Sequence, residues 1–137
     1  MTISFDLSPE LMSNPVITVD LKKLFDVIKS GFDYYTDTNG KVVFADEGKL
    51  CDPDHARRVA ETRFLRVSKQ LREEKRTHCP TLKVEDGKII LCDGRNRVAA
   101  LIAAGYENVE VVLTSPHYNP DYDFKQDIVF VKNSIGA

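Results

Sequence analysis

Residues 82–113 constrain the fold of this chain more than any other segment, because β-rich runs and glycine turns alternate there in one order. The runs 82–84 and 88–91 flank Glu85-Asp86-Gly87, and an Asp-Gly pair between such runs is a strong signal for a hairpin. A second pair, Asp93-Gly94, ends the second run. The segment is therefore predicted to begin with two antiparallel strands, after which the chain turns.

The residues after this second turn predict a helix followed by another strand. Apolar residues at positions 98, 99, 101 and 102 recur with helical spacing, and Gly105 is a residue type that commonly follows the end of a helix. Apolar residues at 109, 111 and 113 then predict a strand. Strands and a helix in this order favour an α+β fold built on a small mixed sheet.

The turn at Asp93-Gly94 is the strongest candidate for a functional site. The first N–H groups of a helix lack helical acceptors and carry partial positive charge, so they can bind an anion. Gly94 lets a ligand approach the backbone, and the guanidinium groups of Arg95 and Arg97 suit phosphate oxygens. Asp93 is predicted to cap the helix through its carboxylate. The alternative is an ordinary capped helix whose arginines are solvated.

The same segment resembles the ParB/sulfiredoxin superfamily, whose members carry a proline-initiated strand, a hairpin and a Gly-x-x-Arg turn that opens a helix. The matching residues here are Pro80, Asp86-Gly87, Gly94-Arg95-Asn96-Arg97 and Ala99-Ala100. The resemblance implies a small mixed β-sheet flanked by helices. It also implies a nucleoside triphosphate, CTP or ATP, with its phosphates at the turn and with Mg²⁺ as a companion ion.

The resemblance further implies roles for individual residues. Either Asp93 or Glu61 would serve as base or metal ligand in NTPase or phosphotransferase chemistry, and no metal site built from protein side chains alone is expected. Sulfiredoxins place their catalytic cysteine directly after the turn glycine, where this chain has Arg95, so sulfiredoxin activity is not expected. The implied nucleotide-binding residues are Thr81, Gly94, Arg95, Asn96 and Arg97, together with His55 and Arg57 from an upstream element similar to the family's Gln-x-Arg.

Charge is unevenly distributed along the chain, although the formal net charge is only −2. Residues 55–97 hold twelve Lys and Arg against six Asp and Glu, whereas residues 1–54 and 98–137 are both acidic. Most of the basic charge lies on a helix predicted from about Asp54 to Lys75, whose apolar stripe includes Phe64. This helix raises a second hypothesis, a nucleic-acid-binding or nuclease-like accessory protein of phage or plasmid type that uses the basic residues 57–76.

A third hypothesis is an interaction module that keeps the fold without catalysis. For His55 and Arg57, the alternative to a ligand role is simply the start of the charged helix. For the whole basic segment, the alternative is a solvated helix face neutralised by the acidic ends of the fold. The sequence leaves the oligomeric state undetermined.

The remaining segments complete a single domain over residues 1–137. The N-terminal part, 16–45, is predicted to hold a helix capped by Asp20 and a hairpin around Asn39-Gly40. The core motif region is 55–114, and residues 127–131 are predicted to form a closing strand.

Several classes of protein are excluded at this stage. No apolar run approaches the length of about 20 residues that a membrane span needs, and the N-terminus lacks the features of a signal peptide. Three cysteines without CxxC spacing suggest neither a disulfide framework nor zinc. A cytoplasmic protein is therefore expected, and Cys92, which lies on a strand of apolar neighbours, is predicted to be a buried small residue rather than a nucleophile.

Overall fold

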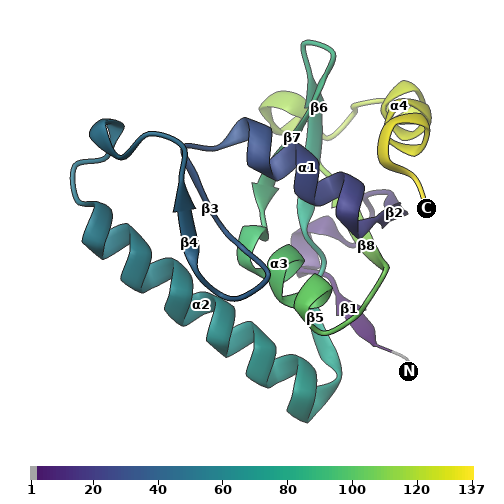
Figure 1. Cartoon of the computed structure of the whole chain (residues 1–137). Helices are drawn as coiled ribbons and strands as arrows, with labels where there is room; N and C mark the ends of the chain where they lie inside the picture. The colour runs from purple at the N-terminus through teal and green to yellow at the C-terminus, as the bar shows by residue number, and fades with distance from the viewer. Residues whose placement is uncertain (1–2) are drawn as a thin grey trace.

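A computed structural model describes residues 3–137 and shows an α+β fold, as the sequence predicted. Its centre is a mixed four-stranded sheet with the strand order β2-β8-β6-β7 (Figure 1). Within it, β6 pairs antiparallel with β7 and parallel with β8, and β8 pairs antiparallel with β2. The strands of this sheet are β2 (Val16–Asp20), β6 (Thr81–Glu85), β7 (Lys88–Asp93) and β8 (Asn108–Leu113).

Within residues 3–137, four helices and two small two-stranded sheets surround this central sheet. A hairpin of two short strands lies over α2 and α3, and a parallel pair joins the N-terminal strand to the strand that follows α2. The helices are α1 (Leu21–Gly31), α2 (Pro53–Glu74), α3 (Arg95–Ala103) and α4 (Lys125–Ile135). The small sheets are β3 (Tyr34–Thr36) with β4 (Val42–Phe44), and β1 (Ser4–Asp6) with β5 (Arg76–His78). Single 3₁₀ turns occur at Pro9–Leu11, Glu47–Lys49 and Pro116–Tyr118.

One hydrophobic cluster holds these elements together. It contains buried side chains from the central sheet and from all four helices. The helix α3 contributes most completely, because Val98, Ala99, Ala100 and Leu101 are all at most 1% exposed. A helix buried to this extent is a rigid support for the backbone N–H groups and side chains at its N-terminus.

The hairpin between β6 and β7 has the predicted turn. Asp86 and Gly87 both have positive φ, 53° and 71°, which is the backbone of a type I′ turn. The pairing runs in register up to Leu82 opposite Leu91 and then shifts, so that Thr81 faces Asp93. Cys92 is therefore the extra residue of a β-bulge immediately before the turn into α3, and a bulge redirects the side chains that follow it.

The predicted N-terminal elements are also present. The carboxylate of Asp20 accepts a hydrogen bond of 2.9 Å from the backbone N–H of Lys23 and caps α1. The predicted hairpin around Asn39-Gly40 is the β3–β4 pair. The predicted basic helix is α2, whose side chains at Phe64 and Leu71 are buried.

The predicted closing strand at 127–131 is wrong, because this segment lies in the helix α4. Short apolar runs do not distinguish a strand from a buried helix. Burial of Asp127, Val131 and Ile135, at steps of four residues, shows the helical face that packs against β2. The phenol of Tyr122 donates a hydrogen bond of 2.7 Å to the carboxylate of Asp127, which lets this acidic residue be buried in the first turn.

Candidate functional site: an arginine-lined pocket at the start of α3

The turn between β7 and α3 requires a glycine for two separate reasons. Gly94 has φ +112°, a conformation that strains any residue with a side chain. A Cβ atom added there would lie only 2.9 Å from the Cβ and 3.0 Å from the Cα of Pro80. The turn therefore depends on close packing between Gly94 and the residue that precedes β6.

The predicted cap by Asp93 is wrong, although the predicted turn is present. Asp93 is the last residue of β7 and Gly94 is the N-cap of α3, so the carboxylate stands one residue too early to cap the helix. It accepts a hydrogen bond of 2.9 Å from the Arg97 guanidinium instead. The first backbone N–H with a helical acceptor is that of Val98, which bonds to the Gly94 carbonyl. The three N–H groups before it are therefore the helix-terminal donors.

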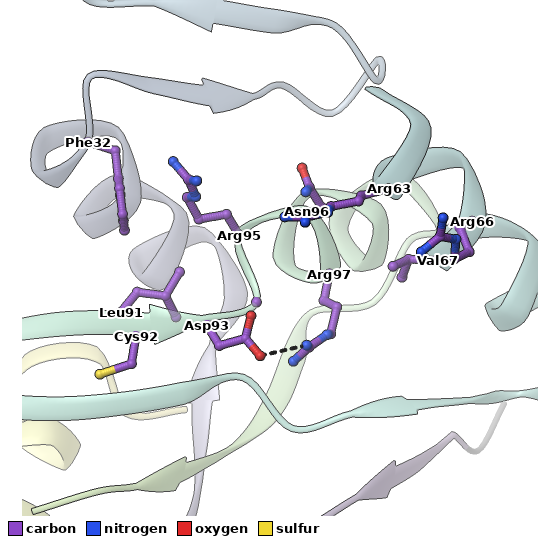
Figure 2. Close-up of a pocket in the computed structure, with 11 residues that line it drawn as sticks. Phe32, Arg63, Arg66, Val67, Leu91, Cys92, Asp93, Arg95, Asn96 and Arg97 are labelled. Carbon is purple, nitrogen blue, oxygen red and sulfur yellow. Dashed lines mark hydrogen bonds and ion pairs between the residues drawn. The ribbon is translucent and has the colours of Figure 1, made fainter. Parts of the chain in front are cut away.

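These donors lie at the edge of a pocket of about 340 Å³, whose walls come from α2, α3, the end of β7 and the residue after α1 (Figure 2). This volume is at the lower end of the range for small-molecule sites. Four arginines and one aspartate give the lining a net positive charge. The lining residues are Phe32, Arg63, Arg66, Val67, Leu91, Cys92, Asp93, Gly94, Arg95, Asn96 and Arg97.

The β3 end of the small hairpin holds Arg95 in place. The Arg95 guanidinium carbon lies 4.4 Å from the centre of the Phe32 ring and 4.6 Å from that of Tyr34. One guanidinium nitrogen also donates to the Tyr34 carbonyl at 3.2 Å. Such cation–π contacts orient the group without neutralising its charge. Arg95 is therefore a positioned cation at the mouth of the helix N-terminus.

Arg97 is largely enclosed, with a side chain only 19% exposed, whereas Arg63 and Arg66 are exposed. One of its nitrogens donates to the Cys79 carbonyl at 3.3 Å, and the other pairs with Asp93. These contacts use only part of the five N–H donors of a guanidinium. Arg97 can therefore still donate to a ligand, because the Cys79 carbonyl and the Asp93 carboxylate fix its orientation without using all of its donors.

Arg63 and Arg66 form the opposite wall, on α2 (Figure 2). Both side chains are exposed, and within residues 3–137 neither makes a hydrogen bond or an ion pair. Helix α2 therefore supplies two cations that pair with no carboxylate of the described residues. Their charges add to that of Arg95 across the same pocket.

Asn96 links the pocket to the hairpin. Its side-chain oxygen accepts a hydrogen bond of 2.7 Å from the buried hydroxyl of Thr36. That contact leaves the NH₂ group of the Asn96 amide as a donor on a residue that lines the pocket. The hairpin thus orients both Arg95 and Asn96.

The structure places the other predicted site residues outside this pocket. Arg57 pairs with Asp54 at 2.9 Å and lies over the Phe44 ring, while His55 is exposed in the first turn of α2. Thr81 lines two other cavities, both of which also reach Asp93 and one of which reaches Arg97. Glu61, on α2, is not among the lining residues. Of the two predicted catalytic acids, only Asp93 is at the pocket.

The prediction that Cys92 is buried is wrong. Cys92 is exposed beside the pocket, on the outward face of β7 that Lys88 and Ile90 also occupy, whereas Cys79 is the buried cysteine. Burial raises the pKa of the Cys79 thiol to about 11, and the nearby carboxylates of Glu110 and Asp6 add to the effect. Cys79 is therefore protonated and unreactive at neutral pH.

A ligand in the pocket is expected to protect Cys92 from alkylation. Iodoacetamide should label Cys51 and Cys92, which are exposed, and leave Cys79 unmodified in the folded protein. If the pocket binds the nucleotide that the sequence resemblance implies, that nucleotide at saturation should slow labelling of Cys92 several-fold and leave that of Cys51 unchanged. Peptide mass spectrometry over a time course would show the difference. Equal protection of both cysteines would indicate a general effect on the protein instead.

Comparison with family models, with curated proteins and with solved structures finds no match to this chain. The fold and the site define it as an α+β domain with an arginine-lined pocket at a helix N-terminus. In the part of the chain that the structure describes, no group of three or more His, Cys, Asp or Glu side chains is arranged to hold a metal ion. None of the helices there has the length and apolar character needed to cross a bilayer.

Sequence reasoning missed Arg63 and Arg66 as site residues. Both belong to the predicted basic helix, and both lie on one flank of α2, between its buried stripe and its outer face. Their helical phase was a usable signal. The sequence does not show that α2 packs against α3, and this packing brings the two arginines to the pocket.

Proposed function

We propose that the pocket at the start of α3 binds the phosphate groups of a nucleotide. The observation that carries the proposal is the convergence of four arginines from two helices on one helix N-terminus. Backbone N–H groups at a helix start favour an anion, and guanidinium groups add full charge and bidentate geometry. The resemblance of Gly94-Arg95-Asn96-Arg97 to the ParB/sulfiredoxin motif supports the same assignment.

Different residues of the pocket would bind different phosphate groups of such a nucleotide. The helix-terminal N–H groups would hold one phosphate together with Arg95 and Arg97. Phe32 and Tyr34 already orient Arg95, and Asp93 orients Arg97. Arg63 and Arg66 would bind further phosphate oxygens from the α2 side. The site therefore suits a chain of phosphates better than a single carboxylate.

Asp93 is the residue that would link binding to catalysis. Its carboxylate is 70% exposed and lies beside the arginines, so it suits the role of ligand for Mg²⁺ carried by the nucleotide, or of general base. NTPase or phosphotransferase activity is part of this proposal. Positioning and charge neutralisation account for most of the catalysis of phosphoryl transfer.

Nucleotides are expected to stabilise the protein against thermal unfolding. We would compare CTP, ATP, GTP and UTP, with and without Mg²⁺, in a thermal-shift series. A ligand at about 100 times its dissociation constant adds roughly 2.7 kcal/mol to the free energy of unfolding. The matching nucleosides without phosphate serve as controls. If none of the triphosphates shifts the melting temperature, the proposal fails and a non-catalytic interaction module becomes the better explanation.

A further inference from the structure

The outer face of α2 carries a row of exposed cations with an exposed leucine among them. Arg58, Leu65, Lys69 and Arg72 are spaced by seven, four and three residues, so they share one side of the helix. Leu65 is 66% exposed and lies among these cations. We call these residues, with Arg66 at their edge, the α2 face.

The cations of the α2 face have no carboxylate partners. Within residues 3–137, Arg58, Lys69 and Arg72 make neither hydrogen bonds nor ion pairs. The stretch 57–72 holds six basic residues and a single acidic one, Glu61. Charge complementarity therefore points to a polyanion as the occupant.

The α2 face is continuous with the pocket, because Arg66 belongs to both. From Arg58 to Arg72 the face is about 21 Å long at the rise of an α-helix. That length exceeds what a free nucleotide can cover. A ligand that contacts the whole row must extend along the helix beyond the pocket.

We propose that the α2 face and the pocket together bind a single-stranded nucleic acid whose terminal phosphate lies in the pocket. This inference rests on the proposed function, because it requires the pocket to bind phosphate. The terminal phosphate is held by Arg97 and the start of α3, and the following phosphates contact Arg66, Lys69 and Arg72.

A single strand fits these surfaces better than a duplex does. The pocket volume of about 340 Å³ admits a terminal nucleotide but not the end of a double helix. The exposed side chain of Leu65 can contact unpaired bases, which present their apolar faces only when they are unstacked. A duplex would turn its phosphates toward the same helix and leave Leu65 without a partner.

The test compares oligothymidylates of about 12 nucleotides that end in a 5′-phosphate, a 3′-phosphate or hydroxyls only. Each carries a fluorophore inside the strand, and binding is followed by fluorescence anisotropy as the salt concentration rises. One phosphorylated form should bind at least tenfold more tightly than the hydroxyl form. A duplex of the same length should bind more weakly than the single strand.

Two variants separate this inference from the proposed function. The triple variant Arg58→Gln, Lys69→Gln, Arg72→Gln should lower the slope of log affinity against log salt by about 2, at about 0.7 for each phosphate that the variant no longer neutralises. It should leave the affinity for a free nucleotide, measured by calorimetry, unchanged. The matched control removes three exposed lysines from α1 and α4 (Lys22→Gln, Lys125→Gln, Lys132→Gln) and should retain wild-type strand binding.

Three results would overturn the inference. They are equal affinities for phosphorylated and hydroxyl-ended strands, equal or tighter binding of the duplex, and wild-type strand binding by the triple α2 variant. Free-nucleotide binding is measured separately, so it can still be observed when any of these three results overturns the inference. If the wild type binds no free nucleotide, it is the proposed function that fails.

Discussion

Replacing Arg97 by alanine should weaken nucleotide binding by about tenfold to a hundredfold. Charge-assisted hydrogen bonds contribute roughly 1.5–3 kcal/mol, which corresponds to this range of affinity. Removal of the guanidinium also leaves the Asp93 carboxylate without its partner at 2.9 Å, so an uncompensated negative charge would face the incoming phosphates. Calorimetric titration of the wild type and the variant measures the change.

Three further variants show whether the effect comes from the ligand contact. Arg97→Lys should restore only part of the affinity, because an ammonium group lacks the bidentate fork. Asp93→Asn breaks the same ion pair but keeps the arginine, so it should bind a magnesium-free nucleotide at least as well as the wild type. Arg72→Ala removes an α2 cation that does not line the pocket and should have little effect. If Arg97→Ala binds as tightly as the wild type, the phosphates lie elsewhere.

Replacing Gly94 by alanine should destabilise the protein by about 2–5 kcal/mol and remove nucleotide binding. The left-handed backbone at this residue costs roughly 1–2 kcal/mol once a Cβ is present, and overpacking typically adds about 1–3 kcal/mol. The added Cβ would push against Pro80 at 2.9 Å, so β6 and the start of α3 would have to separate. Urea unfolding and calorimetry measure the two consequences.

Two other glycines serve as matched controls. Gly105 also has positive φ, at +90°, but nothing lies within 4 Å of an added Cβ, so Gly105→Ala should show the backbone cost alone. Gly31 has neither constraint, and Gly31→Ala should change stability least. Equal destabilisation by Gly94→Ala and Gly105→Ala would show that packing against Pro80 contributes nothing.

Features that depend on neighbouring residues were predicted well from the sequence. The Asp86-Gly87 hairpin, the cap at Asp20 and the turn at Gly94 each arise from backbone preferences of a few adjacent residues. The amphipathic pattern of α2 likewise predicted which side of the helix is buried at Phe64 and Leu71. Such signals are read without knowing what the segment packs against.

Features that depend on distant contacts were not predicted. Pairing of β1 with β5, which joins residues about seventy positions apart, leaves no local signal beyond two short runs of mixed residues. The segment 127–131 is apolar enough for a strand, but in the fold it is a helix that packs against β2, with the Asp127 carboxylate hydrogen-bonded to Tyr122.

The candidate site shows the same division. The sequence by itself determined the glycine turn and the arginines at 95 and 97, because a strand that ends in Asp-Gly before an apolar helix allows little else. The tertiary structure decided that Asp93 pairs with Arg97 instead of capping α3, and that α2 brings Arg63 and Arg66 to the same pocket. The physical reason is that a bulge one residue long and the packing of two helices set side-chain directions, and neither is encoded in local propensity.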